Sequence, residues 1–291
     1  MSAGNAIVFG VNIPTSADDG DPIAAAQGAE HLEFDFISCS DHPCGATPSY
    51  ETWTMLSWIA ANTTRIRLAT RVLGVPYRNP AMVAKMAETF DRLSGGRLIL
   101  GLGGGSADDE HRAFGLGVRS PKQKTDGLRE AATIIRGLWT EPRLSFAGDI
   151  YATDDAEIEP KPERRIPIWL GTFAPRALAL TGRLADGWIP SLGYASPAEL
   201  IVMRQRVLDA AGAAGRDPTE ITCVVNAEVN VGGDDGGDDS VIAGSVDVVT
   251  ERLRFFLDSG FSGINFMLER AALNEQMERV AREVIPHLGA P

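Results

Sequence analysis

The sequence predicts a single (β/α)8 barrel, or TIM barrel, over residues 1–291. Strand-like and helix-like segments alternate eight times along the chain, which is the pattern of such a barrel. The length of 291 residues is enough for eight units and a full core. A doubly wound open sheet is the alternative. Against it, no GxGxxG motif follows the first strand and no shift in composition marks a second domain.

The expected strands are short apolar segments, and a helical pattern follows each of them. The strands are Ile7–Ile13, Phe34–Ser38, Ile66–Val75, Arg97–Leu102, Ile166–Leu170, Gly187–Pro190, Ile221–Val231 and Gly263–Leu268. The helices are Pro22–Leu32, Thr52–Ala61, Pro80–Leu93, Lys122–Trp139, Ala174–Leu184, Pro197–Ala214, Val246–Ser259 and Leu273–Leu288. Asp21, Asn79 and Ser196 each precede a proline at a helix start, so we expect them to be N-caps.

Two segments depart from the alternation. Residues 140–165 contain two short strand-like runs, Leu144–Phe146 and Ile150–Ala152, around Gly148 and Asp149, followed by a proline-bearing loop. This pattern predicts a hairpin that is either an insertion over the site or a surface arm. Residues 232–240 are rich in glycine and aspartate and have no apolar periodicity, so we expect a mobile acidic loop.

The composition is typical of a globular protein, with 44% hydrophobic and 23% charged residues. The net charge of −12 argues against a nucleic-acid partner, because phosphate binding needs a basic face. No apolar run is long enough to span a membrane and no signal peptide is evident, so we expect a cytoplasmic protein without a membrane partner. Cys39, Cys44 and Cys223 have no metal-binding spacing and are expected to be reduced thiols.

The strand Phe34–Ser38 runs into the polar sequence Ser40-Asp41-His42. Barrels and open α/β sheets bind ligands at the carboxyl ends of their strands, so this is where a site is expected. His42 is the candidate catalytic residue, and a structural role is the alternative. Asp41 could fix its tautomer, although on a strand it would point to the other face. No second ligand lies at metal-binding spacing.

The next candidates follow the third and fourth strands. The Thr70 hydroxyl could bind a ligand edge, or it could be an ordinary strand residue. Arg71 is unusual in an apolar strand and requires a buried partner or a ligand anion. Gly103 and Gly104 would let the backbone approach a flat ring or a phosphate, although a flexible barrel-top loop explains them equally well.

The fifth strand ends in Gly171-Thr172, and a helix follows with Ala174-Pro175. Free backbone N–H groups and the positive end of a helix dipole meet at such a point. Thr172 adds a hydroxyl, and Arg176 lies in the first helical turn. We interpret this segment as a phosphate site, with a tight turn as the alternative.

The chain contains no GxSxG motif, P-loop or HExxH motif. One histidine, a few hydroxyls, glycines and a phosphate cradle remain. This set favours a bound redox cofactor that supplies the chemistry while the protein orients it.

These features together resemble the bacterial luciferase-like superfamily, within its coenzyme F-420-dependent oxidoreductase branch. The resemblance extends from Ile7 to about Val284. It rests on the stretches FDFISCSDH, TRVLGVPYRNPAMVAKMAETFDRLSGGRLILGLGGG, LSFAGDIY, IPIWLGTFAPRALALTGRLADGWIPS and VTERLRFFLDSGFSGINFML. The SDH, YRNP…SGGR and GxxxPRALxxxxRLADGW patterns are more specific for the superfamily than for the branch.

The resemblance implies a dimeric (β/α)8 barrel with insertions at the barrel top. It implies that His42 lies near the reactive centre of the cofactor. The segment expected to pack on the cofactor ring, with a cis peptide bond after its second residue, is Thr70, Arg71 and Val72. The expected phosphate-binding turn is Gly171, Thr172, Phe173 and Ala174.

The leading interpretation is therefore an oxidoreductase that transfers a hydride between coenzyme F-420, a deazaflavin, and a small organic substrate. A two-component FMN-dependent monooxygenase is the alternative, and either enzyme could work with a flavin or F-420 reductase. A non-catalytic cofactor-binding protein or an acidic interaction partner is a third reading. Relatives that oxidise glucose 6-phosphate have a Trp shortly after the histidine and a Glu after the fourth-strand glycines. Ala46 or its neighbours, and Ser106, occupy these places here, so that activity is not carried over.

Overall fold

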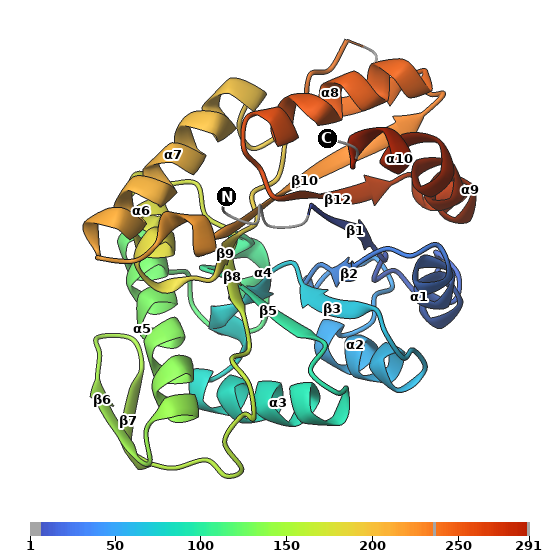
Figure 1. Cartoon of the computed structure of the whole chain (residues 1–291). Helices are drawn as coiled ribbons and strands as arrows, with labels where there is room; N and C mark the ends of the chain where they lie inside the picture. The colour runs from blue at the N-terminus through green and yellow to red at the C-terminus, as the bar shows by residue number, and fades with distance from the viewer. Residues whose placement is uncertain (1–6, 235–236, 290–291) are drawn as a thin grey trace.

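The computed structural model describes residues 7–234 and 237–289, and these form a closed barrel of parallel strands surrounded by helices (Figure 1). The strands of the barrel, in spatial order, are β1 (Val8–Asn12), β2 (Phe36–Cys39), β3 (Arg67–Thr70), β5 (Leu98–Gly103), β8 (Ile168–Leu170), β9 (Gly187–Trp188), β10 (Thr222–Val231) and β12 (Gly263–Leu268). β9 pairs with β10, and β12 pairs with β1, so the sheet has no open end. The predicted barrel is confirmed, and the open-sheet alternative is wrong.

The helices cover the outside of the barrel (Figure 1). They are α1 (Pro22–His31), α2 (Thr52–Ala61), α3 (Pro80–Leu93), α5 (Pro121–Thr140), α6 (Pro175–Leu184), α7 (Pro197–Ala213), α8 (Val246–Asp258), α9 (Leu273–Arg279) and α10 (Ile285–Leu288). The expected N-caps are confirmed, because the side chains of Asp21, Asn79 and Ser196 each accept a hydrogen bond from a backbone N–H in the first turn.

Apart from small shifts at element ends, four features differ from the prediction. The third strand is interrupted: β3 ends at Thr70, and β4 (Leu73–Gly74) resumes after a cis peptide bond between Arg71 and Val72. The acidic sequence Asp108-Asp109-Glu110 after the fourth strand begins a short helix, α4 (Asp108–Ala113). A π-helical segment, Val280–Val284, separates α9 from α10. An additional strand, β11 (Val241–Gly244), pairs with β10.

The acidic loop lies between β10 and β11, and residues 235–236 of it are outside the described residues. The expectation that this loop is mobile stays a prediction.

Residues 140–165 form the predicted hairpin, with strands β6 (Leu144–Ala147) and β7 (Ala152–Ala156) paired antiparallel. The hairpin lies beside α5 (Figure 1). The buried carboxylate of Glu130 on α5 accepts hydrogen bonds from the N–H groups of Asp149, Ile150 and Tyr151, at 3.0, 2.9 and 2.8 Å. Within the described residues no part of this segment lines the cavity at the barrel mouth. It is a surface arm, not a cover over the site.

The lower part of the barrel interior is apolar and filled. Phe36 and Trp169 meet edge to face with ring centroids 5.6 Å apart. Gly10 lies beside Phe36 in the β1–β2 register, and a Cβ at this glycine would be 2.1 Å from the Phe36 ring. A polar layer follows toward the carboxyl ends, with Ser38 and Asn265 in contact at 2.9 Å. The floor is closed, so any ligand must enter from the carboxyl ends of the strands.

Candidate functional site

A cavity of about 880 Å³ opens at the carboxyl ends of the strands. Its volume lies within the usual range for a cofactor site. The structure brings most of the sequence-predicted site residues to this cavity. Those that line it are Asp41, His42, Arg71, Val72, Gly103, Gly104, Gly171, Thr172, Phe173 and Ala174. His42, Gly104 and Gly171 therefore share one rim, as the predicted barrel requires.

Thr70 and Arg176 are not among the residues that line the cavity. The Thr70 hydroxyl donates to the Gly101 carbonyl at 2.7 Å and accepts from the Gly101 N–H at 2.9 Å. It therefore ties β3 to β5. The Arg176 side chain is 64% exposed and lies 3.2 Å from an Asp126 carboxylate oxygen. The structure gives both residues partners within the protein.

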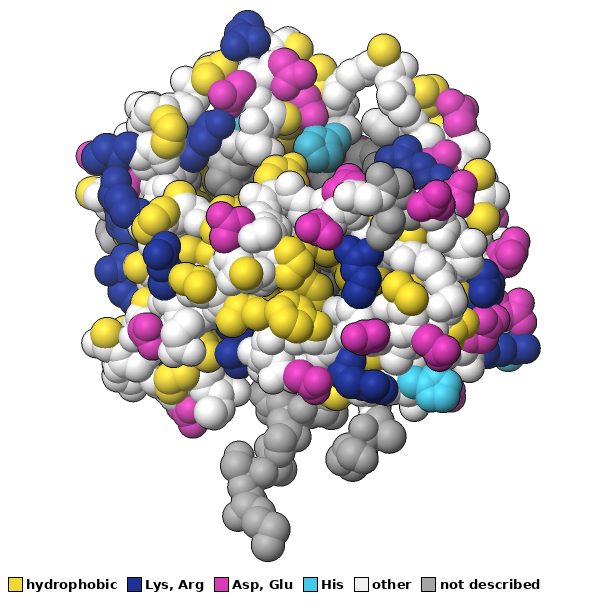
Figure 2. All heavy atoms as spheres, turned by 90° about the horizontal axis from the view of Figure 1, so that it is seen from above, with side chains coloured by type: hydrophobic (Ala, Val, Ile, Leu, Met, Phe, Trp, Pro, Cys, Tyr) yellow, Lys and Arg dark blue, Asp and Glu magenta, His cyan; other side chains and the backbone are white. Residues whose placement is uncertain are grey.

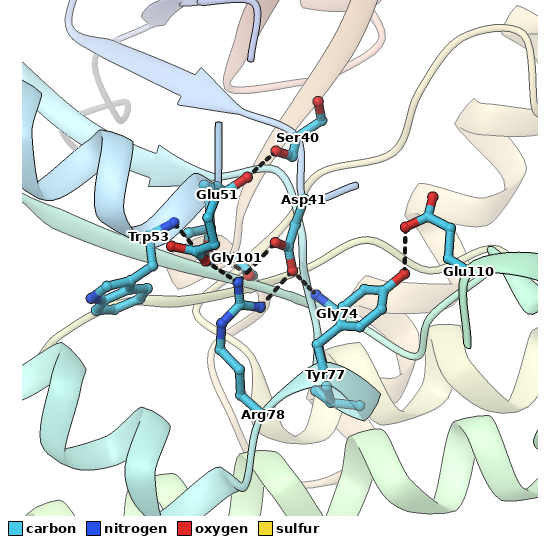
Figure 3. A network of polar contacts seen from close by, with 12 residues as sticks. Ser40, Asp41, Glu51, Trp53, Gly74, Tyr77, Arg78, Gly101 and Glu110 are labelled. Carbon is cyan, nitrogen blue, oxygen red and sulfur yellow. Dashed lines mark hydrogen bonds and ion pairs between the residues drawn. The ribbon is translucent and has the colours of Figure 1, made fainter. Parts of the chain in front are cut away.

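His42 is paired with Glu110. Its Nδ1 atom lies 2.7 Å from Glu110 Oε1, and the second carboxylate oxygen accepts a hydrogen bond of 2.8 Å from the Tyr77 hydroxyl. Figure 3 shows Tyr77 pointing toward Glu110. Burial, followed by the hydrogen bond to Glu110, raises the pKa of Tyr77, so this phenol stays a donor at neutral pH. With Nδ1 occupied, Nε2 is the ring nitrogen left for a ligand.

Sequence reasoning missed Glu110 as the partner of His42. The signal was present as the acidic turn 108–110, but nothing in it distinguished one carboxylate from the other two. α4 leaves Asp109 exposed and buries Glu110. The acid beside the histidine thus comes from α4 and not from the position after the glycines, where Ser106 stands.

Asp41 does not serve His42. Its carboxylate accepts two hydrogen bonds from Arg78, at 2.7 and 3.0 Å, and one from the Gly74 N–H at 2.9 Å (Figure 3). Burial lowers the pKa of Arg78, but the hydrogen bonds and charges of Asp41 and Glu51 together outweigh this effect, so the net shift is upward. Arg78 also pairs with Glu51. The idea that Asp41 fixes the histidine tautomer is wrong, because this carboxylate is fully buried in a structural ion pair.

The glycines at the strand ends make room for Val72. A Cβ at Gly103 would lie 2.5 Å from a Val72 methyl carbon, and a Cβ at Gly171 would lie 3.1 Å from the other. Val72 therefore fills the space between β5 and β8, and its apolar side chain forms part of the cavity surface. Gly101 is needed for a different contact, since its Cβ would lie 1.9 Å from the Thr70 carbonyl oxygen.

The turn from β8 to α6 offers free backbone donors. Ala174 is the N-cap of α6 and provides no side-chain cap. The N–H groups of Thr172, Phe173 and Ala174 have no acceptor within residues 7–234 and 237–289. The Thr172 hydroxyl is 2.8 Å from that of Thr181, so the side chain faces α6. Backbone N–H groups at the N-terminus of a ten-residue helix suit an anion such as phosphate.

No group of three His, Cys, Asp or Glu side chains within the described residues could hold a metal ion. Cys39, Cys44 and Cys223 are free thiols. Burial raises the pKa of Cys39 to about 12 and that of Cys223 to about 11, so both are unreactive at neutral pH.

The outer surface carries charges of both signs. On the face shown in Figure 2, acidic and basic side chains are interspersed, and a group of apolar side chains lies near its centre. Among the described residues, no helix has both the length and the apolar character needed to cross a membrane.

The model of the luciferase-like monooxygenase family matches residues 10–261. This range includes β2, the His42 loop, the glycines of β5 and the β8–α6 turn. The chain belongs to the luciferase-like monooxygenase family. The resemblance seen in the sequence is thereby confirmed.

Several relatives of this luciferase-like chain carry the names of F-420-dependent dehydrogenases. An F-420-dependent glucose-6-phosphate dehydrogenase of Intrasporangium calvum is 39% identical over 173 residues, which are 57% of this chain and 52% of the relative. An enzyme of the same name from Nakamurella multipartita is 32% identical over 70% of this chain and 62% of its own length. An F-420-dependent hydroxymycolic acid dehydrogenase of Mycobacterium tuberculosis is 33% identical over 68% of this chain and 56% of its own length. The chain thus spans less than two thirds of these relatives.

Solved structures show the same fold across the family. An F-420-dependent secondary alcohol dehydrogenase in complex with an F-420–acetone adduct superposes with a TM-score of 0.87 at 19% identity, covering 97% of this chain and 99% of that one. The F-420-dependent tetrahydromethanopterin reductase of Methanopyrus kandleri gives a TM-score of 0.81 at 20% identity over 97% and 99%. At these identities the likeness supports the barrel and its closure.

Proposed function

We propose that this luciferase-like chain is a coenzyme F-420-dependent oxidoreductase that transfers a hydride between the coenzyme and a small organic substrate. The observation that carries the proposal is the His42–Glu110 pair at the mouth of a cavity that also holds an anion-binding helix terminus. The names of the relatives point to the same chemistry.

The residues present fit the deazaflavin. Val72, seated between Gly103 and Gly171, offers an apolar surface for one face of a flat ring. The free N–H groups of the β8–α6 turn would bind the phosphate through Thr172, Phe173 and Ala174. The volume of about 880 Å³ leaves room for a small substrate beside the ring. When bound, the coenzyme would accept or donate the hydride, which carries two electrons.

The chain's own contribution is proton transfer and orientation. As an alcohol substrate loses a hydride from its carbon, His42 Nε2 accepts the proton from its oxygen, and a carbonyl product results. In the reverse reaction, a carbonyl substrate gains a hydride at its carbon, and His42 Nε2 returns the proton to its oxygen. The Glu110 carboxylate at 2.7 Å holds the imidazole and stabilises its protonated form. The carboxylate is itself held by the Tyr77 hydroxyl.

Titration with coenzyme F-420 and with FMN, followed by fluorescence quenching, tests the proposal. We expect F-420 to bind at least tenfold more tightly, and the bound coenzyme to be reduced by an alcohol or oxidised by a carbonyl compound. Tighter binding of FMN, with oxygen consumption in the presence of a flavin reductase, would replace the proposal with an FMN-dependent monooxygenase. Binding of neither would overturn both.

We further propose that the chain forms a homodimer through the outer faces of α2 and α3. Three large apolar side chains on these helices are exposed, namely Trp58, Met82 and Leu93, with exposed fractions of 65%, 57% and 82%. Exposed large apolar side chains are typical of protein interfaces. Light scattering should give twice the chain mass, and Trp58→Glu should give the monomer. A monomer in the unmodified protein would reject the α2 and α3 faces as a dimer interface.

A further inference from the structure

Arg71 is a cation inside the barrel mouth that has no ion-pair partner among the described residues. It follows the last residue of β3, and its side chain lines the cavity. Its Nε donates to Asn12 Oδ1 at 3.1 Å. Within residues 7–234 and 237–289, no carboxylate lies within ion-pair distance of its guanidinium, and the two Nη groups have no acceptor. A guanidinium stays protonated in proteins, so Arg71 presents a positive charge to the cavity.

Other partly buried arginines have partners for their Nη groups. Arg97 has no carboxylate partner among the described residues, but its Nη groups donate to the carbonyls of Ile66 and Ala60. Arg78 and Arg136 each pair with a carboxylate, at 2.7 and 2.6 Å. Burial lowers the pKa of Arg67, and nearby Asp35 and Asp91 counter it. Burial also lowers the pKa of Arg71, but there the countering groups are the Cys39 thiol and the Tyr194 phenol, and neither is a carboxylate. A buried charge without an opposite charge beside it destabilises the folded protein, unless a bound ligand supplies that opposite charge.

A chain of neutral hydrogen bonds fixes the arginine. Beyond Asn12 it includes Ser38, then Asn265 and Asn226. Asn265 Nδ2 donates to Ser38 at 2.9 Å and to Asn226 at 2.8 Å. This network spans β1, β2, β10 and β12 and carries no charge. It orients Arg71 without neutralising it, which leaves the charge available for a ligand.

We propose that Arg71 binds the carboxylate of the substrate, so that this oxidoreductase acts on small hydroxy or oxo acids. The inference rests on the proposed function and names its substrate class. One uncompensated cation matches a monoanion, and the Nη groups of an arginine match the two oxygens of a carboxylate. A phosphate dianion would need more positive charge. The other cation lining the cavity, Lys124, is already paired with Asp108, and Glu228 adds a negative charge.

Binding of matched probes tests the assignment without turnover. Acetate, lactate and benzoate are compared with ethanol, propan-2-ol and benzyl alcohol by ligand-observed NMR, in wild type, Arg71→Met and Arg71→Lys. We expect at least one carboxylate to bind wild type at least tenfold more tightly than its uncharged partner. Arg71→Met should abolish that difference and Arg71→Lys should restore part of it. Arg183→Met, an exposed arginine on α6, should bind the probes like wild type.

Two further measurements separate the alternatives. The melting temperature of Arg71→Met should equal or exceed that of wild type, because a desolvated charge is removed; a lower value would show that Arg71 is structural. The dissociation constant for F-420 should stay within twofold, and a tenfold rise would assign Arg71 to the coenzyme. The absence of any carboxylate preference in wild type rejects the inference. Arg71-dependent carboxylate binding without F-420 binding would instead reject the proposed function.

Discussion

His42 Nδ1 and Glu110 Oε1 lie 2.7 Å apart, although 68 positions separate the two residues in the chain. The histidine follows β2, and the glutamate lies on α4, which follows β5. Barrel closure brings the ends of these strands to one rim. The His42 side chain is 58% exposed, whereas that of Glu110 is 11% exposed. A buried carboxylate thus holds an accessible imidazole at the cavity mouth.

Replacing His42 by alanine should abolish turnover while preserving the fold. The side chain is largely exposed and the phosphate turn is elsewhere, so melting temperature and F-420 affinity should change little. Loss of a proton-transfer group typically costs ~10²–10⁴ in rate. Steady-state kinetics and thermal melting on one preparation decide the matter. Unchanged turnover per folded molecule would remove His42 from the mechanism, and a lower melting temperature alone would make it structural.

Glu110→Gln keeps the shape of the side chain but removes the charge that stabilises a protonated His42. We expect kcat to fall by about tenfold or more, by analogy with the carboxylates that orient metal-bound histidines, with the F-420 dissociation constant unchanged. Asp109→Asn is the control, because Asp109 is the exposed neighbour on the same helix. Equal kcat in the two variants would contradict a positioning role for Glu110.

Gly171→Asp should weaken F-420 binding by at least tenfold, ~1.4 kcal/mol or more. The new Cβ would lie 3.1 Å from Val72, and the carboxylate would repel a phosphate at the α6 terminus. Gly212→Asp places the same change on α7, where a Cβ has no neighbour closer than 3.7 Å. Fluorescence titration of both variants checks the prediction. An unaltered dissociation constant in folded Gly171→Asp would move the phosphate elsewhere.

Arg78→Met should destabilise the protein strongly, because it leaves the buried Asp41 carboxylate without its arginine partner. Breaking one side of a buried ion pair costs ~3–5 kcal/mol. Arg143→Met removes an arginine that is 58% exposed from its pair with Asp155, which should cost about 0–1 kcal/mol. Urea unfolding measures both. If Arg78→Met and Asp41→Asn combined recovers no stability relative to Arg78→Met alone, the explanation by an unpaired buried carboxylate fails.

His111 should make the protein less stable at mildly acidic pH. Its ring is 1% exposed, and its Nε2 has no partner within the described residues. Burial, and then Lys124, lower the pKa of His111 below its ordinary value of 6.5. The unfolded chain therefore binds the proton more tightly, and stability is complete above pH 6.5 and declines as the pH falls toward the folded-state pKa.

Urea unfolding at pH 7.5 and pH 5.5 is the measurement, with His111→Asn as the variant that cannot titrate. Wild type should lose more free energy of unfolding between the two pH values than the variant does, because all other groups titrate in both. Identical losses would show that folding does not lower the pKa of His111.

The sequence alone determined the barrel, most of its elements and the neighbourhood of the site. These are local properties: apolar runs between turn residues predict strands, and capping residues such as Asn79 predict helix starts. Parallel strands bring their carboxyl ends to one rim. For this reason His42, Gly104 and the Gly171 turn could be assigned to one site before any coordinates were known.

Only the tertiary structure determined which side chains of the site pair with one another. Asp41 is adjacent to His42 in sequence, but both residues lie in the loop after β2, where Asp41 pairs with Arg78 and His42 pairs with Glu110. Thr70 is at a strand end, yet its hydroxyl is used by Gly101. Pairing depends on the distances between side chains from distant segments, and those distances exist only once the barrel has closed.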